Sequence, residues 1–163
     1  METLRRLFTF ILLLLVQVLV LNRVQLFHCA TPLLYVYFTI MLPAGTPRWE
    51  ALVWSFLMGL SVDVFTNTPG VAAASMTLLG LLQPYLLPLF LPRDADDDVR
   101  SAASALGWGK FATMTTILVM VYCLFFFSIQ AFSFANLLYW VECVAGSSLI
   151  TLLFILTLES LRK

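Results

Sequence analysis

Charged side chains are scarce in this sequence, and their scarcity excludes most of the functions that depend on them. Only 11% of the 163 residues are Asp, Glu, Lys or Arg, whereas a soluble domain carries about 25%. The formal net charge is zero, so the chain lacks the basic excess of a nucleic-acid-binding protein. The three cysteines (Cys29, Cys123, Cys143) and one histidine have neither metal-site spacing nor a disulfide pattern.

Catalytic groups are equally sparse. The sequence contains no Ser/His arrangement and no Gly-rich phosphate loop, and His28 is its single histidine. No pair of residues suits general acid–base chemistry in water. We therefore expect a protein that is not an enzyme, with no cofactor and no metal ion.

Apolar residues are abundant instead. They make up 61% of the chain, and the mean hydropathy is +0.97. A chain of this length could not bury so much apolar surface in water, so its solvent must be membrane lipid. A helix needs about 20 apolar residues, within a range of about 17–25, to cross the hydrocarbon core. Six stretches approach that length, at residues 4–21, 26–42, 49–65, 71–91, 111–129 and 137–158.

These stretches predict an all-α integral membrane bundle of six transmembrane helices that forms one domain over residues 1–163. No small-x-small cleavage site follows the first stretch, so we interpret it as a retained helix rather than a signal peptide. The second stretch is weakened by Pro32 and bounded by Pro43. Pro84 and Pro88 are expected to kink or end the fourth helix near Gln83.

Basic residues orient the predicted bundle, because cytoplasmic flanks carry an excess of Lys and Arg. With the N-terminus inside, every one of the nine Lys and Arg residues except Arg23 falls on the cytoplasmic side. Both termini and the long loop 92–110 are then cytoplasmic. The other connections are short, which predicts antiparallel neighbours.

Two carboxylates, Asp63 and Glu142, are predicted to lie within the membrane. Both fall roughly 4–8 Å below the outer boundary at 1.5 Å per residue, and Arg23 is close enough in the predicted topology to reach either. A buried carboxylate needs a partner, water or a proton. The two acids therefore either snorkel to the surface, form a structural lock, or line a proton or ion path. Other polar groups have simpler interpretations. We expect Gln17 to form hydrogen bonds between helices. Glu159 near Arg162, and Arg48 near Glu50, are expected to be charges at the membrane interface.

A short motif connects the third and fourth stretches. Gly59 and Asp63 are four residues apart, so they share one helix face. Gly59 lets a neighbouring helix approach, while Asp63 can accept hydrogen bonds from Asn67 and Thr68. The pair formed by Pro69 and Gly70 reverses the chain. This pattern predicts a helical hairpin with a polar lock at its outer tip.

The small residues that open the fourth stretch serve either internal helix packing or docking of a partner. Gly70 and Ala74 form a small-xxx-small pair, which lets helices approach closely in lipid. If this face docks a second copy of the chain, the protein is a homodimer.

From Gly59 to Gly70 the chain resembles the MreD family of bacterial rod shape-determining membrane proteins, which are similar to it over their whole length. Gly59, Asp63, Pro69 and Gly70 match the family's Gly-x-x-x-Asp helix end and its Pro/Gly turn. Thr66 stands where Ser is common, and Pro69 is followed directly by Gly70 where an apolar residue often intervenes.

This resemblance implies a non-catalytic scaffold or regulator of the peptidoglycan-synthesising elongation machinery in the bacterial cytoplasmic membrane. The implied partners are an MreC-like protein, a RodA-type glycosyltransferase with its transpeptidase and, indirectly, the MreB cytoskeleton.

The family's fold is similar to the substrate-binding subunits of energy-coupling-factor transporters, which suggests a solute-binding membrane subunit as the alternative. Such a subunit needs an outward cavity lined by polar and aromatic groups. The sequence offers few candidate polar ligands for one, which favours the scaffold. A lipid-modifying enzyme is disfavoured because catalytic groups are lacking.

Overall fold

The computed structural model describes residues 1–23, 31–43, 45–94, 106–131 and 135–162. All regular structure in these ranges is helical. The elements are α1 (Glu2–Leu19), the 3-10 turn η1 (Leu21–Arg23), α2 (Val36–Ile40), α3 (Arg48–Thr66), α4 (Val71–Phe90), α6 (Trp108–Ala131) and α7 (Leu137–Arg162). Five of these segments are long and apolar enough to cross a membrane: α1 with η1, α3, α4, α6 and α7. The chain is therefore an all-α, multi-pass membrane protein.

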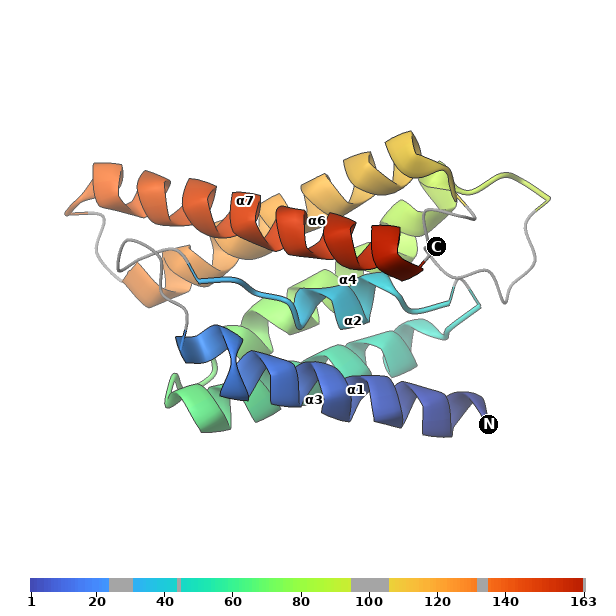
Figure 1. The fold of residues 1–163 in the computed structure, drawn as a ribbon, viewed down its shortest axis with the longest axis horizontal. Coiled ribbons are helices and arrows are strands. Elements are labelled where there is room, and N and C mark those ends of the chain that lie inside the picture. Colours follow the sequence, from blue (N-terminus) through green and yellow to red (C-terminus); the bar gives the residue numbers. More distant parts are fainter. Residues whose placement is uncertain (24–30, 44, 95–105, 132–134, 163) are drawn as a thin grey trace.

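Helices α3, α4, α6 and α7 run antiparallel in turn, whereas α1 runs parallel to α3 because the segment 31–42 returns the chain through the bundle between them (Figure 1). Helix α3 packs on α4, α4 on α6, and α6 on α7, while α1 packs on α3. With this returning segment included, both termini lie at the same end of the bundle (Figure 1). We call this the terminal end, and we call the opposite end, where α3 turns into α4, the hairpin end.

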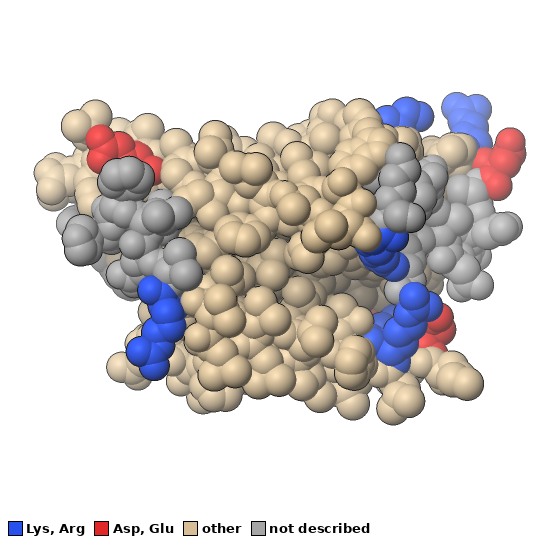
Figure 2. All heavy atoms as spheres, viewed as in Figure 1, with Lys and Arg blue, Asp and Glu red and all other residues tan. Residues whose placement is uncertain are grey.

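Basic residues gather at the terminal end, as the predicted topology requires. Figure 2 shows Lys and Arg concentrated there, with little positive charge at the hairpin end. Helix α3 begins at Arg48 and α7 ends at Arg162, both at the terminal end, whereas η1 ends at Arg23 near the hairpin end. Arg100 and Lys163 lie outside the described residues.

The second predicted helix, 26–42, is wrong for most of its described length. Residues 31–35 are not helical, and α2 comprises only Val36–Ile40. Residues 24–30 lie outside the described residues. The segment still traverses the bundle toward the terminal end (Figure 1), and Leu33 to Leu42 are all buried. Non-helical backbone is tolerated at membrane depth only where protein surrounds it.

Side chains of two surrounding helices satisfy the backbone of this segment. The amide of Gln17 on α1 accepts from the Leu34 N–H at 3.0 Å and donates to the Pro32 carbonyl at 2.9 Å. From α7, Thr151 Oγ1 accepts from the Leu33 N–H at 3.1 Å, and Ser147 Oγ accepts from that of Thr31 at 3.2 Å. These contacts stand in for the missing helical hydrogen bonds, which explains why an apolar stretch containing Pro32 can remain extended here.

Of the two effects expected from the prolines, a kink or an end near Gln83, the structure excludes the end of α4 there. It continues through Pro84 and Pro88 to Phe90. Gln83 is buried, and its side-chain amide donates to the Leu42 carbonyl at 3.2 Å. Neighbouring segments can supply partners where proline interrupts a membrane helix, and this contact ties the middle of α4 to the end of the buried segment.

Candidate functional site

A carboxylate from α3 caps the first turn of α4 at the hairpin end. Gly70 is the N-cap residue of α4 and has no side chain to accept hydrogen bonds. Instead, Asp63 accepts from the Ala72 N–H through Oδ1 and from the Ala73 N–H through Oδ2, both at 2.9 Å. The Thr68 hydroxyl donates to Oδ1 at 2.9 Å. A negative charge at a helix N-terminus also complements the helix dipole, so Asp63 holds the two helices together.

The turn residues place this cap. Asn67 ends α3 in the left-handed conformation at φ 57°, where its N–H donates to the Asp63 carbonyl. Asn and Gly tolerate this conformation better than other residues, and Gly70 adopts it at φ 81°. Asn67 therefore contributes a backbone donor, one of the two kinds expected from it, and this donor reaches the Asp63 main-chain carbonyl instead of the carboxylate. Pro69 lies between these two residues and belongs to the turn.

Gly59 lets α3 touch the backbone of α4, as its place in the motif predicts. A Cβ added at Gly59 would lie 2.5 Å from the Ala72 carbonyl oxygen and 2.6 Å from the Ala73 Cα. These are the residues whose N–H groups bind Asp63, so one helix face supplies both the close approach and the cap. Sequence reasoning missed a second contact of this kind at Gly80, where a Cβ would lie 2.6 Å from Ser55 Oγ.

The structure does not bring Arg23 or Glu142 to Asp63. Both side chains are exposed, whereas Asp63 is 5% exposed. Among the residues that the structure describes, neither forms an ion pair with it. The three hydrogen bonds above therefore account for the burial of Asp63.

Two other charge assignments need correction. Glu159 is not an interfacial charge, because it is 4% exposed and accepts a hydrogen bond from the Tyr37 hydroxyl at 2.8 Å. Glu50 pairs with Arg6 of α1. Arg48 instead lies over the Tyr85 ring, with its guanidinium carbon 4.6 Å from the ring centroid. The partner of Glu50 is therefore on another helix and not its sequence neighbour Arg48.

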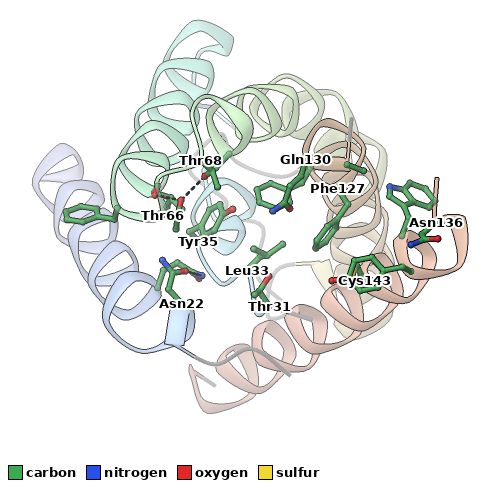
Figure 3. A pocket seen from close by; sticks show the side chains of 18 residues that line it. Asn22, Thr31, Leu33, Tyr35, Thr66, Thr68, Phe127, Gln130, Asn136 and Cys143 are labelled. Atoms are coloured by element: carbon green, nitrogen blue, oxygen red, sulfur yellow. Dashed lines mark hydrogen bonds between the residues drawn. The ribbon is translucent and has the colours of Figure 1, made fainter. Parts of the chain in front are cut away.

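A cavity of about 640 Å³ adjoins the hairpin cap. Figure 3 shows side chains from the buried segment and from the surrounding helices directed around it. Its uncharged polar groups come from Gln17, Asn22, Thr31, Thr66, Thr68, Gln130 and Asn136. Its aromatic groups come from Tyr35, Phe65, Phe126, Phe127, Tyr139 and Trp140. No charged residue is among the described residues that line it.

The expectation of few polar ligands was therefore wrong. The polar residues are scattered along the sequence, and many of them stand where an apolar stretch ends, as Asn22, Thr66 and Gln130 do. Membrane helices that end at the same depth bring the polar residues at their ends together. Their position at the ends of the apolar stretches was the signal in the sequence that could have revealed the cavity.

The lining of the cavity suits the binding of a ligand. The Tyr35 hydroxyl at its wall is hydrogen-bonded to the Tyr122 hydroxyl, and their rings pack edge to face at 5.8 Å. The nearby Asp63 carboxylate has its oxygens engaged by N–H and O–H donors. In the described ranges, no three His, Cys, Asp or Glu residues lie close enough to hold a metal ion. Uncharged hydrogen-bonding groups and aromatic faces recognise ligands by shape and polarity.

Compared with protein-family profiles, with curated proteins and with solved structures, this chain matches none of them.

Proposed function

We propose that this chain is a non-catalytic membrane scaffold or regulator of the bacterial cell-elongation machinery, acting in the manner of the MreD family. The observation that supports the proposal is the hairpin built from Gly59, Asp63, Pro69 and Gly70, the residues that carry the family resemblance. Each has a structural task there: backbone contact, helix capping or chain reversal. Such a hairpin presents a rigid surface, and rigid surfaces suit partner binding.

The proposed site of action is the bacterial cytoplasmic membrane, with both termini in the cytoplasm. The proposed partners are an MreC-like protein, a RodA-type glycosyltransferase with its transpeptidase and, indirectly, MreB. A homodimer is compatible with the small residues that begin α4. Ala74 on this helix is exposed, while Val71 to Ala73 are buried against the rest of the bundle.

Depletion and complementation test this function. Depletion is expected to round the rod-shaped cells that carry the protein, and wild-type protein is expected to restore rods. Asp63→Asn is expected to restore them poorly, whereas Glu142→Gln, which changes an exposed acid at the same end of the bundle, should act like wild type. Rods that persist without the protein would contradict the proposal, as would turnover of a cell-wall precursor by the purified protein.

A solute-binding membrane subunit of a transporter is the second candidate, and the 640 Å³ cavity is the observation that favours it. Pockets of about 300–1,000 Å³ with apolar walls and a few polar groups are typical of small-molecule sites. If this candidate is right, a solute will raise the thermal stability of the purified protein. Asn136→Leu, in the cavity, should abolish that effect, while Thr116→Val, on the exposed face of α6, should preserve it. A screen without any stabilising solute would count against it.

A further inference from the structure

A second cavity, of about 280 Å³, lies at the terminal end between α1, the buried segment and α7. Arg5 and Arg6 reach it from the start of the chain, and Arg162 reaches it from the end. The positive-inside rule explains why arginines lie at this end, but it does not require arginines from opposite ends of the chain to line one cavity. We infer that this cavity binds the phosphate group of an anionic phospholipid.

The charges around the cavity favour an anion. No acidic residue is among the described residues that line it. Glu50 pairs with Arg6, and Glu159 lies behind the wall, where it accepts from Tyr37. The described lining of the cavity therefore carries three arginines and no carboxylate. Arginine is well suited to phosphate, because its planar guanidinium can donate two parallel hydrogen bonds.

The protein does not saturate the donors of Arg6. One terminal nitrogen donates to Glu50 and the other lies 3.4 Å from Thr46 Oγ1. Its Nε–H is buried and has no acceptor within the described part of the chain. A guanidinium has five N–H donors, and each terminal nitrogen carries a second N–H beyond these two contacts, so Arg6 has remaining capacity for an anionic partner.

The rest of the cavity favours a lipid over a free phosphate ion. Phe38, Met41 and Leu42 form an apolar wall beside the arginines. Along α1, Leu12 lies seven residues after Arg5, on the same helix face, and is 50% exposed. An acyl chain could follow this face while its phosphate remains at the arginines. The cytoplasmic leaflet, where the basic residues place this end of the bundle, carries anionic lipid.

Native mass spectrometry of the full-length protein in neutral detergent, titrated with phosphatidylglycerol or phosphatidylcholine, tests this site. The wild type is expected to retain one phosphatidylglycerol in preference to phosphatidylcholine. An arginine at the membrane surface contributes about fivefold in affinity, so Arg5→Gln should weaken retention about fivefold. Arg5→Gln with Arg162→Gln should weaken it about 25-fold on the same basis. Arg93→Gln removes the same charge from an exposed residue outside the cavity and should change retention less than twofold.

Several outcomes would overturn the inference. Equal losses in Arg93→Gln and Arg5→Gln would mean that only general surface charge attracts the lipid. Equal retention of the two lipids would remove the role of the anionic headgroup. Glycerol 3-phosphate that binds as tightly as the lipid would assign the site to a soluble phosphate. Arg5 is exposed, so Arg5→Gln should fold even if the double variant does not, and Arg5→Lys should retain most of the binding.

Discussion

Replacing Asp63 with Ala should separate α3 and α4 at the hairpin end. The substitution removes the acceptor for the Ala72 and Ala73 N–H groups, which are the second and third amides of α4. Ala72 and Ala73 are 1% and 3% exposed, so water cannot easily take the place of the carboxylate. The N-cap residue, Gly70, has no side chain that could substitute.

The structure sets the size of this effect. Leaving one buried donor unsatisfied costs about 1–3 kcal/mol, and loss of a helix cap costs about 0.5–2 kcal/mol. For two stranded amides we expect a loss of about 2–4 kcal/mol in the free energy of unfolding. In a chain of this size, that corresponds to a fall in Tm of roughly 5–15 °C. Asp63→Asn keeps one acceptor oxygen, so about half of the loss is expected.

Thermal unfolding of the purified variants in one detergent is the appropriate assay. Glu142→Ala is the matched control, because it removes an exposed acid from the same end of the bundle. Glu159→Ala would be a poor control, since Glu159 is buried and bonded to Tyr37. If Asp63→Ala unfolds at the same temperature as Glu142→Ala, the capping argument fails.

Three further predictions concern packing, the buried segment and topology. Gly59→Ala should destabilise the protein by about 1–3 kcal/mol through overpacking, because its Cβ would meet the Ala72 backbone. Gly109→Ala is the control in the same unfolding assay. It should be neutral or stabilising, because no atom lies within 4 Å of the added Cβ. Gln17→Leu should lower the free energy of unfolding by about 2–4 kcal/mol, because it leaves the Leu34 N–H and the Pro32 carbonyl without partners. An equal loss of stability in Gln130→Leu, which changes an exposed glutamine, would contradict this. Reporter fusions at Asn67 and Ala135 should score outside and those at Arg48 and Lys110 inside, and one reversed score would break the topology.

The hairpin could be predicted because its determinants are local. Gly59 and Asp63 share a face by helix periodicity, and Pro69 with Gly70 gives the turn. The motif could not predict every donor that binds the Asp63 carboxylate. Two of them are backbone amides of Ala72 and Ala73, and their position depends on how the next helix packs.

The buried segment could not be predicted, because hydropathy does not separate a transmembrane helix from an extended apolar segment inside a bundle. Its conformation depends on Gln17, Ser147 and Thr151, of which the last two lie more than 100 residues away in sequence: the contacts span separations of 116 and 118 residues. Glu159 was misplaced for a related reason, since its partner Tyr37 is 122 residues away.

The most direct test of the proposed function is purification of the tagged protein from its own cells in mild detergent, followed by identification of the proteins that accompany it. We expect an MreC-like protein and a RodA-type glycosyltransferase with wild-type protein and with Glu142→Ala, and a clear loss of both with Asp63→Ala at matched membrane abundance. Recovery of transporter components instead, or of the same proteins with an unrelated multi-pass control, would contradict the scaffold function.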